Sequence, residues 1–123
     1  MVNKVILVGY LGQDPELNHT SSGQAVTNLR LATSRNWKDK DSSERKTETE
    51  WHDVIVWGKQ AEACGNHLAK GRLVYVEGRI KTEKWQDKQT GQDRYRVKIV
   101  AESVRFLGGA PTSDESHQPE DPE

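Results

Sequence analysis

Three of the four tryptophans in this 123-residue chain lie in one charged stretch, from Arg35 to Lys59, and Trp85 directly follows a lysine elsewhere. Only Trp57 comes at the end of an unbroken apolar run. An indole offers a flat π-face on which a nucleic-acid base can stack, while lysine and arginine neutralise phosphates. A single tryptophan is more often a packing residue. Four of them beside cations indicate a surface for single-stranded nucleic acid, since a duplex hides the faces of its bases.

The candidate binding residues come from two segments that carry both aromatic and basic side chains. We expect bases to stack on Trp37, Trp51, Trp57 and Trp85. We expect phosphate contacts from Lys38, Lys40, Lys46, Lys59, Lys81, Lys84 and Arg94. Asp53 is an exception, because strand alternation would place its carboxylate on the same face as Trp51 and Trp57. It either pairs with a neighbouring lysine or arginine or weakens phosphate contact locally.

The chain has residues that could support catalysis or bind a metal, but it lacks the further ligands or catalytic partners that such a site needs. Cys64 and His67 are three positions apart on a predicted helix, which provides only half of a metal site. His52 and Asp53 are adjacent on a predicted strand, so their side chains point to opposite faces and cannot form a dyad. The chain has no P-loop, GxGxxG or G-x-S-x-G motif. We therefore predict no catalytic residue, no metal, no cofactor and no enzymatic activity.

The composition indicates one small domain without a membrane segment. Hydrophobic residues make up 33% of the chain and the mean hydropathy is −0.91, so the core is small and burial against sister subunits would help it. No apolar run approaches the roughly 20 residues that a membrane helix needs, and the first residues lack a secretory cleavage signal. A single cysteine excludes an intrachain disulfide and suits a reducing compartment. We expect a cytoplasmic protein.

Charge is distributed unevenly along the chain. The formal net charge is −1, but residues 110–123 hold five of the 19 acids and none of the 18 lysines and arginines. Residues 1–109, with 14 acids against 18 basic residues, therefore carry about +4. The segment 110–123 also has three prolines and no aromatic or large aliphatic residue. We predict a folded domain over 1–109 followed by a disordered acidic tail.

Apolar alternation predicts a mostly β protein. Strands are expected over 3–11, 25–34, 50–57, 73–82 and 94–101, with a short final strand over 104–107. The segment 36–49 is predicted to be a long loop or an extended ribbon, and 83–93 a polar hairpin that turns at Gly91. Apolar residues at i, i+3, i+4 and i+7 predict one helix over 59–70.

This order of elements is that of an OB-fold, with a generic β-sandwich as the alternative. We expect an all-β, five-stranded Greek-key barrel with one α-helix between strands 3 and 4. Alternation within 50–57 turns Val54 and Val56 toward the core and places His52 on the same side. Trp51 and Trp57 then share the outer face. Four glycines are candidates for bends or bulges: Gly9, Gly12, Gly71 and Gly78.

Several segments resemble the bacterial single-stranded DNA-binding protein family. The resemblance extends from Val2 to Gly109 and is carried by VNKVILVGYLGQDPEL, LATSRNWKDK, TEWHDVIVWGKQAE, LAKGRLVYVEGRIKTEKW and TGQDRYRVKIVAE. It implies an OB-fold homotetramer that binds single-stranded DNA without sequence preference during replication, recombination and the repair of DNA damage. By the same resemblance, the family's stacking tryptophans match Trp37, Trp51 and Trp85, and Trp57 stands where the family often has phenylalanine.

The resemblance also implies a subunit interface and partner proteins. The first strand, 3–11 with Lys4 and Ile6, would pair edge to edge with a second copy, and His52 and Tyr75 match interface residues. Replication and repair proteins are candidate partners, which family members dock through an acidic tip closed by Asp-Ile-Pro-Phe. This chain ends QPEDPE, without that tip. The resemblance implies a cytoplasmic, nucleoid-associated location.

Two other kinds of function remain open at this point. An OB-fold relative that serves a primosome or binds RNA would share the groove but prefer a different ligand. A purely structural assembly protein would need another reason for four tryptophans in basic segments. The response of tryptophan fluorescence to oligo-dT, to duplex and to oligo-rU distinguishes these three classes.

Overall fold

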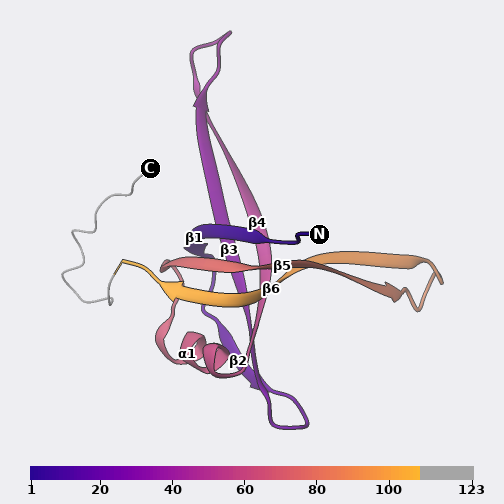
Figure 1. The fold of residues 1–123 in the computed structure, drawn as a ribbon. Helices are drawn as coiled ribbons and strands as arrows, with labels where there is room; N and C mark the ends of the chain where they lie inside the picture. The colour runs from indigo at the N-terminus through magenta and orange to yellow at the C-terminus, as the bar shows by residue number, and fades with distance from the viewer. Residues whose placement is uncertain (109–123) are drawn as a thin grey trace.

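The structure is a computed structural model that describes residues 1–108, so the tail expected over 110–123 lies outside the described residues. Six strands and one helix follow one another along the described chain (Figure 1). Their bounds are β1 Val5–Leu11, β2 Glu16–His19, β3 Ala25–Lys38, β4 Arg45–Trp57, α1 Lys59–His67, β5 Leu73–Gln86 and β6 Asp93–Phe106.

Five of the strands form a closed barrel. Hydrogen-bonded neighbours run in the order β1, β5, β6, β4 and β3, and β3 pairs again with β1 through Tyr10 and Leu11. The pairing of β4 with β6 is parallel and joins Val54 to Ile99 and Ile55 to Val100. A closed five-stranded barrel with one helix is consistent with the predicted OB-fold.

The short strand β2 was absent from the prediction. It pairs with the outer edge of β3 from Glu16 opposite Asn28 to His19 opposite Ala25. The helix consequently follows the fourth strand in chain order, although it follows the third of the five barrel strands. Sequence reasoning missed β2 because only Leu17 in it is shielded from solvent, which leaves no alternation to detect.

The interior of the barrel is small and apolar. On β3 the alternate positions Ala25, Leu29 and Leu31 are buried, and Thr27 between them donates a 2.7 Å hydrogen bond to the backbone oxygen of Glu16. The other buried apolar residues are Leu11, Val54, Val56, Ala61, Cys64, Leu68, Val74, Val76 and Ile99. Helix α1 lies at one end of the barrel beside β2 and contributes two of these residues (Figure 1).

Two glycines allow the barrel strands to approach one another. A Cβ atom on Gly9 would lie 2.3 Å from the carbonyl oxygen of Ala32, where β1 crosses β3. A Cβ atom on Gly78 would lie 2.2 Å from the carbonyl oxygen of Val100. Gly78 also lies at a register shift between β5 and β6, which confirms the bulge expected there.

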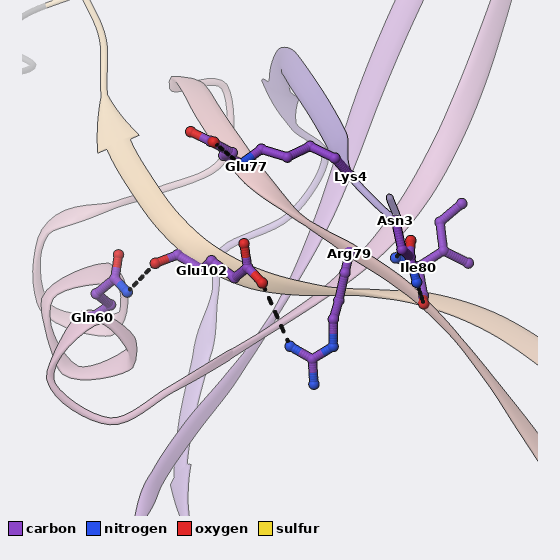
Figure 2. A network of polar contacts seen from close by, with 7 residues as sticks. All are labelled: Asn3, Lys4, Gln60, Glu77, Arg79, Ile80 and Glu102. Carbon is purple, nitrogen blue, oxygen red and sulfur yellow. Dashed lines mark hydrogen bonds and ion pairs between the residues drawn. The ribbon is translucent and has the colours of Figure 1, made fainter. Parts of the chain in front are cut away.

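A side chain of α1 completes the hydrogen bonding of that bulge. Glu102 is the extra residue of β6, because Gly78 pairs with Ala101 and Glu77 pairs with Ser103. The amide nitrogen of Gln60 donates to the carbonyl oxygen of Glu102 at 3.1 Å, as Figure 2 shows. The amide oxygen of Gln60 accepts from the backbone N–H of Val104 at 2.8 Å. Gln60 thereby anchors the helix to β6.

The polar segments are more regular than predicted. Of the two options for 36–49, the ribbon is observed, since β3 and β4 stay paired out to Lys38 opposite Arg45. Similarly, β5 and β6 stay paired out to Gln86 opposite Asp93, and the expected short strand 104–107 is the end of β6. The two ribbons project from the barrel in different directions (Figure 1).

Helix α1 ends at His67, three residues earlier than predicted. The next residue, Leu68, has an extended backbone with φ −102° and ψ 153°, and its side chain is buried in the core. Burial of that leucine therefore competes successfully with continuation of the helix.

Replacing Gln60 with alanine tests the anchoring of α1. Gln60→Ala removes two hydrogen bonds at the bulge and should lower the free energy of unfolding by about 1–3 kcal/mol, measured by urea denaturation followed by circular dichroism. Asn66→Ala, an exposed substitution in the same helix, is the matched control and should change stability much less. Equal effects of the two substitutions would contradict the anchoring role.

Candidate nucleic-acid interface

Trp51 lies in the middle of β4 and Trp57 at its end, both on the outer face of β3 and β4. Val54 and Val56 are buried, whereas Trp51 is 49% and Trp57 is 39% exposed, so the face predicted by alternation is confirmed. Trp51 is paired with Ala32 and Trp57 with Val26. Both indoles are therefore available to a ligand that lies across this side of the barrel.

Arg30 and Asp53 occupy the same outer face and meet each other there. They are direct cross-strand partners, and the Arg30 Nη1 atom lies 3.7 Å from Oδ1 of Asp53. The guanidinium of Arg30 also lies over the ring of Trp51, 5.2 Å from its centroid. Of the two roles left open for Asp53, the structure shows the pairing with an arginine.

Gly12 forms part of the surroundings of Trp51. A Cβ atom on Gly12 would lie 2.3 Å from Cζ3 of the Trp51 indole. The missing side chain therefore allows the ring to lie directly on the backbone after β1. Gly12 was expected only as a candidate for a bend or bulge, and this contact gives a second reason for a glycine at this position.

Trp37 lies on the β3–β4 ribbon, on the face opposite to that of Trp51. It is paired with Lys46, and strict alternation along β3 places it with Thr33 and Leu31, whereas Trp51 lies with Ala32. Its ring is 37% exposed, and the guanidinium of Arg35 lies 4.6 Å from the ring centroid. Trp37 therefore lies on a paired strand of the extended ribbon, which was one of the two options for 36–49.

Trp85 lies on the second ribbon, on β5. It is 49% exposed and is paired with Arg94 of β6. Because the two ribbons diverge from the barrel (Figure 1), the tryptophans are distributed over the barrel wall and both ribbons. The structure does not gather all four into one patch.

Three of the predicted phosphate-contacting residues have carboxylate partners within the chain. Their separations are 3.9 Å for Lys46 with Asp39, 3.5 Å for Lys84 with Asp93 and 3.0 Å for Arg94 with Asp87. A hydrogen bond from the backbone N–H of Gln89, together with Arg94, lowers the pKa of Asp87. Within residues 1–108, the remaining four form no ion pair: Lys38, Lys40, Lys59 and Lys81.

Sequence reasoning missed Arg30 and Arg35 as members of this surface. Strand alternation puts Arg30 on the face opposite Leu29 and Leu31, which was a usable signal. Its contact with Trp51 depends on the register between β3 and β4, which the spacing of residues did not specify. Arg35 gave no signal, because the segment around it has no apolar periodicity.

The predicted interface residues Lys4, Ile6 and Tyr75 meet on the outer face of β1 and β5. Ile6 is paired with Glu77, and the carboxylate of Glu77 contacts the ammonium of Lys4 (Figure 2). The Tyr75 hydroxyl donates to Oε1 of Glu77 at 3.1 Å. Ile6, Val8 and Tyr10 are 59%, 49% and 44% exposed, so this face is more apolar than water-facing strands usually are.

His52 lies elsewhere, on the inward side of β4. Its Nε2 atom is 2.8 Å from the hydroxyl oxygen of Thr33, and its side chain is half-buried. This position confirms that His52 points away from Trp51 and Trp57. No described contact links it to Tyr75 or Lys4 within residues 1–108.

Cys64 and His67, which were considered as half of a metal site, both lie on helix α1. In the described part of the chain, no group of three or more metal-ligating side chains comes together. Burial raises the pKa of the Cys64 thiol to about 11, so it stays protonated near neutral pH. Across residues 1–108, no helix has the length and apolar character needed to span a membrane.

The cluster of Lys4, Tyr75 and Glu77 makes stability depend on pH. Contacts with Lys4 and Tyr75 lower the pKa of Glu77 from 4.5, so its contribution is present above pH 4.5 and is lost as the pH falls below that value. Contact with Glu77 raises the pKa of Lys4 from 10.5, so the Lys4 contribution is lost only at higher pH.

We therefore expect the melting temperature of the wild type to fall more steeply than that of Glu77→Gln between about pH 5 and pH 3. Glu62→Gln, which removes an exposed carboxylate without an ion pair in residues 1–108, should follow the wild type. Parallel curves for the wild type and Glu77→Gln would show that the cluster contributes nothing.

The sequence and the fold both match known proteins. A model of the single-strand binding protein family matches residues 2–107. A solved structure of the Plasmodium falciparum SSB in complex with ssDNA is 30% identical with a TM-score of 0.79, covering 88% of this chain and 97% of that one. A deletion mutant of the single-stranded DNA binding protein from Thermus aquaticus is 33% identical with a TM-score of 0.75, covering 88% of this chain and 51% of that one.

Proposed function

This chain belongs to the single-strand binding protein family, and we propose that it binds and protects single-stranded DNA without sequence preference during replication, recombination and repair. The observation that carries the proposal is the exposure of all four tryptophans, each 37–49% accessible, on strands that also present lysines and arginines. Partner docking and a nucleoid location belong to the same proposal. The protein acts by binding, without a catalytic step.

Base stacking on the indoles supplies affinity that does not depend on sequence. Stacking of bases on aromatic residues of an OB-fold is already established for single-strand binding proteins, at roughly 1–3 kcal/mol for each base. Trp51 and Trp57 are six residues apart on β4, which is roughly 20 Å along an extended strand. They serve as two separate platforms on the barrel wall, and Trp37 and Trp85 add one on each ribbon.

The DNA strand wraps around the molecule instead of following one flat surface. Trp37 and Trp51 lie on opposite faces of the paired strands β3 and β4, so a DNA strand that stacks on both has to cross an edge of this strand pair. Lys38 and Lys40 lie at the tip of the β3–β4 ribbon, where they can neutralise phosphates as the DNA strand passes. Lys59, close to Trp57 in the chain, and Lys81 on β5 can also neutralise phosphates. Lys46, Lys84 and Arg94 contribute less, because each has a carboxylate partner.

The chain assembles into a homotetramer through the apolar outer face of β1 and β5. Ile6 of this face is 59% exposed and is paired with Glu77. The carboxylate of Glu77 contacts both Lys4 and Tyr75. In addition, β3 pairs only with Tyr10 and Leu11 of β1, so at residues 5–8 the edge of β1 that faces away from β5 has no strand partner within the described chain. A second copy can pair there, and His52 takes part from β4. Light scattering should give four times the 13.9 kDa chain mass, and a monomer would contradict the assembly.

Titration of the intrinsic tryptophan fluorescence tests the binding function. Oligo-dT should quench the fluorescence strongly, because bases cover exposed indoles, whereas matched duplex and oligo-rU should have weaker effects. Higher salt should weaken the binding through counterion competition. Equal quenching by duplex, or no quenching by oligo-dT, would contradict the proposal, and a preference for oligo-rU would support the alternative of an RNA-binding or primosomal relative.

Alanine variants identify the indoles that take part. Trp51→Ala and Trp37→Ala should each weaken binding of oligo-dT by about 1–3 kcal/mol, the value of one lost stack. Unchanged affinity in both variants would assign these tryptophans to packing roles.

A further inference from the structure

The paired strands β3 and β4 carry two clusters with the same composition: an acid, an arginine and a tryptophan. In the first triad, Asp53, Arg30 and Trp51, the ion pair spans 3.7 Å and the guanidinium lies 5.2 Å from the ring centroid. In the second triad, Glu48, Arg35 and Trp37, the corresponding distances are 3.3 Å and 4.6 Å. Two of the proposed stacking residues therefore each carry an arginine whose charge is matched by a carboxylate.

Both triads follow from one geometric rule. Arg30 is paired across the strands with Asp53, and Arg35 is paired with Glu48. In each case the tryptophan is two positions away from a member of that pair, so it shares its face. The triads lie on opposite faces of these paired strands, so the arrangement arises twice, independently, from the same cross-strand register.

The ion pairs reduce the charge that a DNA phosphate meets. All four charged side chains are exposed to solvent, with fractions of 47% for Arg30 and 43% for Asp53. A phosphate that approaches Arg30 or Arg35 consequently faces a nearly neutral pair, in contrast to the unpaired Lys38 or Lys40 at the tip of the β3–β4 ribbon. The guanidinium still provides a flat surface for stacking, but the pair releases few counterions on binding.

We propose that Asp53 and Glu48 limit the affinity of this protein for single-stranded DNA by neutralising the arginines that lie on Trp51 and Trp37. The inference rests on the proposed function and deepens it, since it assigns a role to two acids on a surface that binds an anion. Arg30 and Arg35 then act mainly as flat partners of the indoles, and the unpaired lysines provide most of the response to salt.

Amide substitutions test this role without changing side-chain shape. Asp53→Asn and Glu48→Gln each free one arginine, so binding of a fluorescently labelled oligo-dT, followed by anisotropy, should be tighter at low salt. The slope of log K against log salt concentration should steepen by about 0.7 for each freed cation, an extra loss of about 2.6-fold in affinity over a roughly fourfold rise in salt.

The ion pair between Arg79 and Glu102 provides a matched control. Its atoms are 3.8 Å apart and its side chains are 49% and 50% exposed, close to the values for Arg30 and Asp53, but it lies on β5 and β6 (Figure 2). Glu102→Gln makes the same change in net charge and should leave the slope as in the wild type. The double variant Arg30→Gln/Asp53→Asn, which lacks the freed cation, should also return to the wild-type slope.

Two outcomes would overturn the inference: a wild-type slope in both Asp53→Asn and Glu48→Gln, or an equally steep slope in Glu102→Gln, which would make the effect one of net charge. Both are distinct from failure of the proposed function, in which the wild-type protein itself does not bind oligo-dT. Steeper slopes confined to the two triad variants support the assignment.

Discussion

Closure of the barrel is the constraint on which the rest of the structure depends. The circle is completed by a short parallel contact between β4 and β6, which joins Val54 to Ile99 and Ile55 to Val100. Closure divides every strand into inward and outward positions, so a chain with few hydrophobic residues still obtains a continuous core. It also requires close strand crossings, which Gly9 and Gly78 permit, and a bulge that Gln60 supports from the helix.

The surface for DNA follows from what lies outside that closed core. Once Val54 and Val56 are buried, Trp51 and Trp57 have to face outward, where a barrel wall holds them at a fixed separation. Beyond the barrel, the two ribbons have no interior, so both of their faces can carry aromatic and charged side chains. A small domain can therefore present exposed tryptophans in several directions.

Charge on this surface is arranged by strand register as much as by composition. Acids are frequent near the tryptophans, yet many of them face a lysine or arginine on the neighbouring strand, as Asp53 faces Arg30 and Glu48 faces Arg35. The local field that a phosphate meets therefore depends on which cations remain unpaired. The excess of basic residues over 1–109 indicates the kind of ligand, whereas the pairing determines where and how strongly that ligand is attracted.

Alternation within 50–57 was sufficient to predict the inward position of Val54 and Val56, the outward position of Trp51 and Trp57 and the opposite orientation of His52, because the two-residue period is a local property of the backbone. It could not reveal β2, the full length of the ribbons or the face occupied by Trp37, because these segments are exposed on both sides and have no hydrophobic pattern. The contacts of Arg30 with Asp53 and Trp51, and of Lys4 with Glu77, depend on pairing between strands. Register is set by turns and by closure of the whole barrel, so only the tertiary structure could determine them.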